Sequence, residues 1–252
     1  MYYSNIDQFK EANGYGLEDV WYPRVTSIVN IKAKPALYRY YAELANFNEG
    51  EAIKKQSADE GTLVHEAIED ILLGHSPSSD PRVKPAVDAF LKFNESRRIV
   101  ANPDWVEHKV INRDDRYAGT VDALATIDGK FGVLDIKTSQ AIYRDYNLQT
   151  SAYLVPLQKE MRDLSTRWIL RIDQNQKCAK CGATRRVKGG REKIKGLNGR
   201  NPNLCEHEWS EIKGEVELQE FPYFIDDYQA FLGAKKLWEW ENEYWLKQIG
   251  YL

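Results

Sequence analysis

The order of apolar and polar residues predicts a chain in which helices and strands alternate. Apolar residues recur at helical spacing in five segments, and shorter runs of apolar residues indicate strands. The predicted helices cover residues 35–45, 61–73, 84–97, 144–161, where Pro156 should kink or interrupt the helix, and 227–249. The predicted strands cover residues 105–111, the two halves of 119–139, 167–173 and 214–222, whereas 1–24 and 75–81 are predicted to be loop-rich. This order implies an α/β fold with a mixed sheet and helices packed on it.

A hairpin is predicted over residues 119–139, because Asp128-Gly129 separates two strand-like runs. This dipeptide favours a two-residue type I′ turn, and the turn determines which residues lie opposite each other. Asp122 then faces Asp135, and Lys137 lies on the same face, opposite Thr120. The other face carries apolar residues and is predicted to belong to the core.

The two facing acids and the lysine indicate a candidate metal site. Buried carboxylates repel each other unless a cation lies between them, and oxygen ligands suit Mg²⁺ or Mn²⁺. Lys137 beside such an ion can activate a water molecule or stabilise charge on a phosphate. The alternatives are an exposed hairpin end with ordinary surface charges, or a β-bulge that shifts the register and separates the acids.

Four short motifs lie in order along residues 61–153. They are Gly61 and His65 at a helix start, GTVD ending at Asp122, LDIKTS with Asp135 and Lys137, and QTSAY with Gln149 and Tyr153. Their order and spacing resemble the PD-(D/E)XK nuclease superfamily, most closely its RecB-like and Cas4-like exonuclease branch. The first acid of that family often follows a proline, whereas Asp122 follows Gly119-Thr120-Val121.

The resemblance implies a restriction-endonuclease-like α/β/α core with a mixed central sheet, and metal-dependent hydrolysis of DNA. It implies that one or two Mg²⁺ or Mn²⁺ ions are held by His65, Asp122, Asp135 and the Ile136 carbonyl. Lys137 would orient or activate the attacking water. Gln149 and Tyr153 would bind a DNA phosphate or orient the lysine, and Tyr153 would also meet single-stranded DNA.

By the same resemblance, the expected activity is that of an exonuclease acting on DNA ends or single strands, in recombination, repair or phage DNA processing. A recombination or replication protein would be a fitting partner. A structure-specific endonuclease is the alternative enzyme. A non-catalytic DNA-binding subunit with a degraded site is the alternative from another class.

Helical geometry and the resemblance place three residues near this site. His65 falls at the edge of the apolar stripe of helix 61–73, where it either reaches the sheet or makes a local hydrogen bond. Glu69 lies one turn later on the same side and either orients the His65 ring or is solvated. Glu107 in strand 105–111 is a supporting group by resemblance.

A second candidate metal site lies in residues 175–207. Cys178-x2-Cys181 and Cys205-x-His207 offer three thiolates and one imidazole, which suit tetrahedral Zn²⁺. A structural zinc would organise a segment with little apolar content of its own. Incidental free thiols are the alternative, and an iron–sulfur cluster would need a fourth cysteine, which the chain lacks.

Charge separates this segment from the rest of the chain. Residues 175–207 carry nine Lys or Arg and two Glu, a net charge of +7, so the remainder carries −10 of the total of −3. We therefore predict a nuclease core over 1–174 and 208–252, with a basic zinc-binding insert at a hairpin tip. The insert is expected to bind the DNA backbone through these basic side chains. The alternatives are that it is a solvated loop or a segment that docks onto another protein.

Composition and the absence of targeting signals bear on where the protein works. The chain has 252 residues, of which 42% are hydrophobic, so a sizeable core is expected. No apolar run approaches the roughly 20 residues that span a bilayer, and the N-terminus does not resemble a secretory signal. A cytoplasmic protein without a membrane partner, with reduced thiols, is the expectation.

Overall fold

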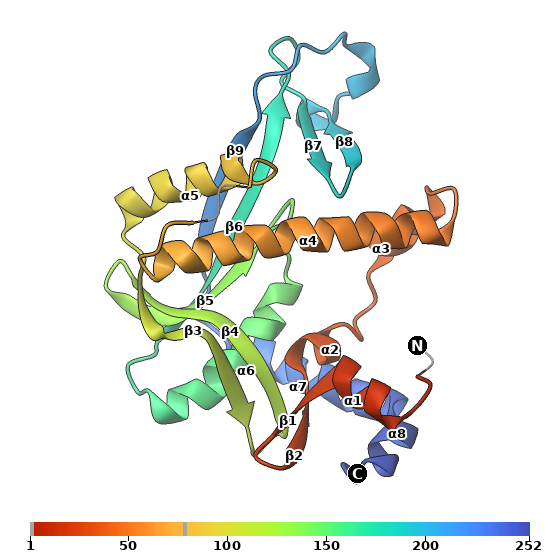
Figure 1. The fold of residues 1–252 in the computed structure, drawn as a ribbon, viewed down its shortest axis with the longest axis vertical. Helices are drawn as coiled ribbons and strands as arrows, with labels where there is room; N and C mark the ends of the chain where they lie inside the picture. Colours follow the sequence, from red (N-terminus) through yellow and green to blue (C-terminus); the bar gives the residue numbers. More distant parts are fainter. Residues whose placement is uncertain (1–2, 78–79) are drawn as a thin grey trace.

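The computed structural model describes residues 3–77 and 80–252, which contain a seven-stranded mixed sheet and helices on both of its faces (Figure 1). The helices are α1 (Ile6–Asn13), α2 (Val25–Val29), α3 (Pro35–Ala42), α4 (Phe47–Leu72), α5 (Lys84–Arg97), α6 (Asp145–Glu160), α7 (Ile225–Glu241) and α8 (Glu243–Gln248), with 3-10 turns η1 (Leu197–Gly199) and η2 (Pro202–Leu204). The strands are β1 (Gly14–Leu17), β2 (Val20–Pro23), β3 (Val100–Asn112), β4 (Tyr117–Ile127), β5 (Lys130–Lys137), β6 (Thr166–Lys177), β7 (Thr184–Lys188), β8 (Arg191–Lys195) and β9 (Lys213–Glu220).

The large sheet has the order β3-β4-β5-β6-β7-β8, and β9 also pairs with β6. Only β5 and β6 are parallel among these pairs of described strands, and α6 makes the crossover that a parallel pair needs. The mixed central sheet predicted from the element order is therefore confirmed. Strands β1 and β2 form a separate two-stranded sheet.

Two apolar clusters hold the helices against the sheet. On one face, α4 and α5 contribute Ile68 and Phe90 to a cluster that includes Leu134 of β5. On the other face, α6 and α7 contribute Leu154 and Phe231 to a cluster with Leu124 of β4. Burial of these side chains is the main source of stability, at about 25 cal/mol per Å² of apolar surface. The sheet residues between the clusters, including any polar ones, are therefore shielded from water.

Helix α4 begins earlier than predicted and runs across the sheet (Figure 1). The Asn46 side chain caps it by accepting a hydrogen bond from the Glu49 backbone N–H at 2.9 Å. Gly61, the predicted helix start, lies in mid-helix, and a Cβ atom there would lie 3.0 Å from the Thr138 hydroxyl oxygen. The glycine thus lets α4 approach the end of β5.

The N-terminal segment is not the predicted loop. Within the described part of residues 1–24, α1 is capped by the Asn5 side chain, and β1 pairs with β2. The turn between these strands uses Glu18 and Asp19 at positive φ, so the glycine that would signal a hairpin is absent. Phe9 is fully buried against Trp21, and this long-range packing stabilises the segment.

Two helix predictions also need correction. Of the kink or interruption predicted at Pro156, the interruption is absent, and the Ala152 carbonyl left without an amide partner accepts a hydrogen bond from the Tyr117 hydroxyl at 2.9 Å. The predicted helix 227–249 divides at Asn242, whose side chain donates to the Trp238 carbonyl at 2.8 Å. Of the predicted loop 75–81, residues 78–79 lie outside the described residues.

Candidate functional site

The β4–β5 hairpin has the predicted turn and register near Asp128-Gly129. Its pairs run from Ile127 opposite Lys130 to Ala123 opposite Leu134, and the ladder ends there. Beyond that point β4 continues only along β3 and β5 only along β6. The hairpin therefore opens at the end where the candidate acids lie.

The predicted direct pairing of Asp122 with Asp135, and of Lys137 with Thr120, is consequently wrong. The Asp122 carboxylate accepts a hydrogen bond from the Ile136 backbone N–H at 2.6 Å, which replaces a ladder bond. The Asp122 side chain thus accepts a hydrogen bond that a backbone carbonyl of β4 would accept in a continued ladder. Asp122, Asp135 and Lys137 remain together at this end of the hairpin, where the charges of Asp122 and Lys137 both act on the pKa of Asp135.

Asp135 is fully buried and contacts two polar side chains. The Lys137 ammonium lies 2.5 Å from Oδ2, and the Gln149 amide donates to Oδ1 at 3.1 Å. Burial raises the pKa of Asp135 to about 6, although the charge of Lys137 lowers it and that of Asp122 raises it further. Burial also raises the pKa of Asp122. Both carboxylates therefore cost free energy when they are ionised without a further cation.

Lys137 is the cation of this cluster. Its ammonium donates to the Ile136 carbonyl at 3.3 Å and lies 5.3 Å from the centre of the Tyr146 ring. Burial alone would lower the pKa of Lys137, but the charges of Asp135 and Asp122 raise it above its usual value. The side chain is therefore charged near neutral pH. Sequence reasoning missed Tyr146, which carries no motif signal.

Gln149 and Tyr153, the predicted pair on α6, do face the acids. The Gln149 amide donates to the Tyr153 hydroxyl at 3.1 Å, in addition to its bond with Asp135. Tyr153 is 2% exposed, and a Cβ atom at Gly119 would lie 2.4 Å from its ring. Such burial leaves no surface for the expected contact with single-stranded DNA. Tyr153 instead holds Gln149, and the glycine of the GTVD motif makes room for its ring.

His65 reaches the same region from α4 and is partly buried. Burial lowers the pKa of His65 to about 4; the charge of Lys137 lowers it too, whereas Asp135 opposes the shift. The imidazole is therefore neutral at pH 7, the form that ligates metals. It lies at the wall of a cavity of about 530 Å³ whose lining residues are Ser57, Ala58, Gly61, Thr62, His65, Glu66, Glu69, Glu107 and Thr138.

Glu69 and Glu107 form an acidic pair in this cavity. Burial raises the pKa of Glu69 to about 7, and the charge of Glu107 and a hydrogen bond with it raise it further. Glu69 is therefore partly protonated near neutral pH, beside Glu107. Its partner is not His65, the role weighed from the sequence, and only the tertiary structure brings the two acids together.

The predicted Mg²⁺ or Mn²⁺ ligands are not gathered as a compact set. Across residues 3–77 and 80–252, one group of at least three His, Cys, Asp or Glu has all its donor atoms within 4.8 Å of one another, and it lies elsewhere. His65, Asp122 and Asp135 do not form such a group, because Asp135 contacts Lys137 and Asp122 binds the Ile136 amide.

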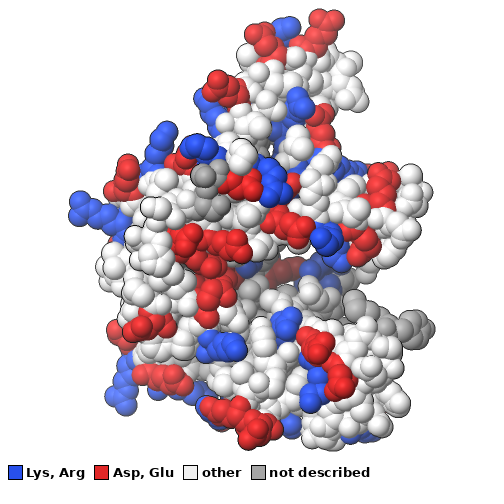
Figure 2. Space-filling model, viewed as in Figure 1, with Lys and Arg blue, Asp and Glu red and all other residues white. Residues whose placement is uncertain are grey.

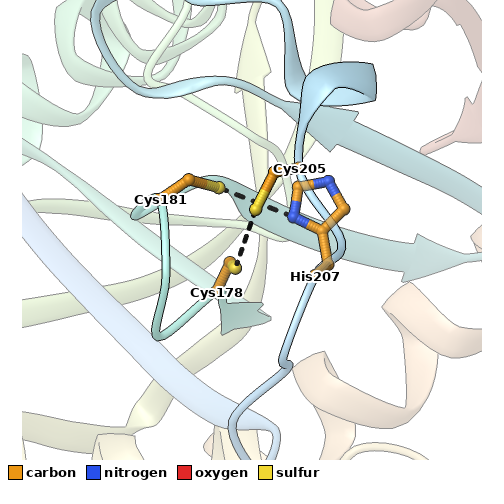
Figure 3. Close-up of side chains that lie close together, drawn as sticks. All are labelled: Cys178, Cys181, Cys205 and His207. Carbon is orange, nitrogen blue, oxygen red and sulfur yellow. Dashed lines mark hydrogen bonds between the residues drawn. The ribbon is translucent and has the colours of Figure 1, made fainter.

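That one group consists of the four predicted zinc ligands (Figure 3). Cys178, Cys181, Cys205 and His207 form a group that could bind a metal ion such as zinc. The sulfur atoms of Cys178 and Cys205 are 4.0 Å apart, and the Cys181 sulfur lies 3.5 Å from Nδ1 of His207. Tetrahedral zinc with bonds of about 2.3 Å separates its sulfur ligands by about 3.8 Å. The spacing therefore fits the ion.

Local turns and one long-range contact build this group. The Gly182 N–H donates to the Cys178 carbonyl at 2.9 Å, with Gly182 at φ +70°, which brings Cys181 back toward Cys178. The backbones of Cys178 and Trp209 form an isolated antiparallel β-bridge, and the Trp209 ring lies beside the His207 ring. Burial raises the pKa of Cys178, but hydrogen bonds from His207 and from backbone amides outweigh it and lower the pKa to about 5. The metal-binding thiolate is thereby favoured.

The insert begins where β6 and β9 stop pairing, with Asn175 opposite Lys213, and β6 continues into it by pairing with β7. Five of its nine basic side chains contact acids or carbonyl groups: Lys177 with Glu215, Arg185 with Glu192, Arg186 with Asp173, Lys188 with Thr138 and Arg191 with Glu43. Acidic and basic side chains are mixed over the face in Figure 2, the insert at its top included. The insert's charge of +7 is therefore partly neutralised within the protein.

Comparisons with known proteins do not assign a family. No protein-family model matches the chain, and no curated protein matches it. One solved structure, described as "Crystal structure of SSO0001", aligns with 90% of this chain and 83% of its own at 13% identity and a TM-score of 0.34. Similarity at that level carries no argument. Within the described ranges, no helix combines the length and the apolarity that crossing a bilayer requires.

Proposed function

We propose that this protein is a Mg²⁺- or Mn²⁺-dependent deoxyribonuclease of the PD-(D/E)XK type, with a restriction-endonuclease-like core, and that it acts as an exonuclease on DNA ends or single strands. The observation that carries the proposal is the contact of Lys137 and Gln149 with the buried Asp135 at the open end of the hairpin. These are the residues of the D-x-K and Q-x-x-x-Y motifs, from separate elements. The succession of β3, β4, β5, α6 and β6 also accords with the family's layout.

The donor chemistry of this site fits a hard divalent cation. Asp122 and Asp135 offer carboxylate oxygens, the Ile136 backbone offers a carbonyl, and His65 offers a neutral imidazole. The raised pKa values of both acids indicate that the protein's own cations do not fully compensate them. When bound, the ion would polarise a phosphate and lower the pKa of a water molecule. Asp122 and Asp135 would hold it, with His65 and the Ile136 carbonyl completing the set.

The remaining residues of the site would position the substrate. Lys137 is charged near neutral pH, so it acts as a hydrogen-bond donor to the attacking water or to a phosphate oxygen. Gln149, held by Tyr153, keeps the Asp135 carboxylate in one orientation. The Lys137 ammonium contacts the Asp135 carboxylate, which would hold the ion. Binding of the ion would therefore require the ammonium to move toward the substrate.

The acidic pair Glu69–Glu107 gives this proposal a second consequence. Both residues line the cavity beside His65, and phosphates would be repelled from it when the pair is ionised. We therefore expect DNA affinity to rise when divalent cations are added. The zinc group and the exposed basic residues of the insert would hold the DNA backbone outside the cavity.

Digestion of end-labelled linear DNA and of a closed circle with Mg²⁺ or Mn²⁺ tests the proposal. Release of short products from linear DNA only supports an exonuclease, whereas opening of the circle would support a structure-specific endonuclease instead. A wild-type protein that binds DNA and cuts neither substrate would be a non-catalytic DNA-binding subunit, and the proposed activity would then be wrong. Lys137→Ala serves as the site-specific control, because it should retain DNA binding and lose cleavage.

A further inference from the structure

The β7–β8 hairpin of the insert returns from the Cys/His group to the nuclease body (Figure 1). Strand β7 begins directly after the turn that holds Cys178 and Cys181, and it first pairs with the end of β6 through Lys177 opposite Thr184. The hairpin tip is Gly189-Gly190, both at positive φ. Its base is thus attached to the metal-ligand group, and its tip lies about five residues away along β7.

The tip is seated on α4. The Gly189 N–H donates to the Glu60 carboxylate at 3.1 Å, and a Cβ atom at Gly189 would lie 2.2 Å from the Ser57 hydroxyl oxygen and 2.4 Å from the Ile53 carbonyl oxygen. Arg191 makes an ion pair with Glu43 at 3.0 Å. The hydrogen bond to Glu60 and the ion pair with Glu43 thus hold the hairpin against α4, at a distance that only a glycine at position 189 allows.

This position brings Lys188 to the end of β5. Its ammonium donates to the backbone carbonyl of Thr138 and, at 2.8 Å, to the Thr138 hydroxyl. Arg186 of the same strand donates to that carbonyl at 3.4 Å and pairs with Asp173 at 2.7 Å. Thr138 directly follows Lys137 and lines the cavity beside His65. The insert therefore holds the residue next to the lysine of the D-x-K motif.

We propose that Lys188 is a positioning residue of the nuclease site: by binding Thr138 it fixes the end of β5 and so the direction of the Lys137 side chain. The inference rests on the proposed function and adds a role for the insert that DNA binding does not require. The Cys/His group then supports catalysis from a distance, because it anchors the strand that carries Lys188. Burial lowers the pKa of Lys188 to about 8, and Arg186 lowers it further, so the ammonium remains the main form at pH 7 and can donate to Thr138.

Kinetics of Lys188→Met and Lys188→Arg test the role. Lys188→Met retains the apolar stem and loses the ammonium, so we expect kcat to fall by about 10–100-fold with KM changed less than about threefold. Lys188→Arg keeps a donor for the Thr138 carbonyl and should recover most of kcat. Lys236→Met on the exposed face of α7 is the matched control and should resemble wild type. An unchanged kcat in Lys188→Met, with a wild type that cleaves DNA, overturns the inference alone.

Gly189→Ala and hydrogen exchange separate this inference from the proposed function. The added methyl group displaces the tip from α4 without altering Lys188, and a similar loss of kcat is expected. Exchange of backbone amides in residues 133–140 should quicken in Gly189→Ala and Lys188→Met, and not in Lys236→Met. If wild type cleaves no DNA, the proposed function fails, and the exchange data still decide whether Lys188 fixes the end of β5: quicker exchange supports that contact, and unchanged exchange overturns it.

Discussion

Two candidate metal sites in one chain differ in how their ligands are brought together. The Cys/His group has four soft or borderline donors within 4.8 Å of one another, and all come from residues 178–207. The acid site draws on α4, β4, β5 and α6, and its oxygen donors contact protein groups. In the first site the donor atoms meet each other, whereas in the second each acid meets a lysine, an amide or a backbone N–H.

The difference follows from the cost of burying charge. Thiols and a neutral imidazole can lie close together without a metal, because they need not be charged. Two buried carboxylates repel each other, and the charge of Lys137 offsets part of that repulsion. The donor atoms of the Cys/His group are therefore already spaced for an ion, whereas the acid site is expected to rearrange when a cation binds.

The largest expected effect is on the Cys/His group. Cys178→Ser removes one of four ligands, and we expect purified protein to lose its stoichiometric zinc and the insert to unfold, since such segments fold with their metal. Metal analysis and a thermal melt measure both. Ala179→Ser, at an exposed neighbouring position, is the matched control and should keep the metal. Retention of zinc by Cys178→Ser, or its absence from wild type, would show that the group is not a zinc site.

Lys137→Ala should have the next largest effect. Loss of the ammonium removes a donor to the water or the phosphate, and we expect single-turnover cleavage to slow by about 10²–10⁴-fold. Lys130→Ala in the same strand is the control, because Lys130 is exposed and pairs with Glu220 at 2.8 Å. Equal rates for the two variants would place the chemistry elsewhere.

Burial of Asp135 should also change how the free energy of unfolding depends on pH. The folded pKa of Asp135, about 6, lies above the ordinary value of 3.8, so between these pH values the folded state binds more protons than the unfolded state. The contribution of Asp135 to stability therefore falls as pH rises through this window, and its full cost applies above pH 6. Urea unfolding at pH 4 and pH 7.5 should show that Asp135→Asn gains about 1–3 kcal/mol relative to wild type between the two pH values.

Asp128→Asn is the control for this measurement. Asp128 lies in the hairpin turn, half of its side chain is exposed, and Asn-Gly forms the same turn. Its stability difference from wild type should change by less than that of Asp135→Asn over the same pH values, because the Asp128 side chain and its ion pair with Arg97 are about half exposed to water. An equally small change for Asp135→Asn would mean that Asp135 is not held protonated by burial, and the comparison between the two sites would lose its basis.

The smallest effect is expected from the exposed lysines of the insert. In a Lys137→Ala background, which leaves DNA uncut, Lys193→Ala with Lys195→Ala should reduce the slope of log affinity against log salt by about 1–1.5 for single-stranded DNA. Lys236→Ala on α7 should leave that slope unchanged. An unaltered slope in the double variant would assign DNA binding to another surface and leave the insert its role at Thr138.

Local chemistry explains which predictions held. The Asp128-Gly129 turn and its register were predictable because a two-residue turn determines pairing nearby. The predicted pairing stops before Asp122 and Asp135, where the Ile136 N–H donates to the Asp122 carboxylate and not to a backbone carbonyl of β4. The loop predicted for residues 1–24 failed for a similar reason, since Phe9 and Trp21 are ordered by distant aromatic packing.

The sequence by itself determined the ligand types, the turn and the spacing of the motifs, because these depend on residue identity and on neighbours within a few positions. It also determined that Cys178, Cys181, Cys205 and His207 lie close enough along the chain to form a metal-ligand group. Only the tertiary structure decided that Glu69 meets Glu107 and that Lys188 binds Thr138, 50 residues away. Such contacts depend on which faces of the sheet and helices bury their apolar side chains together, and no local pattern specifies that choice.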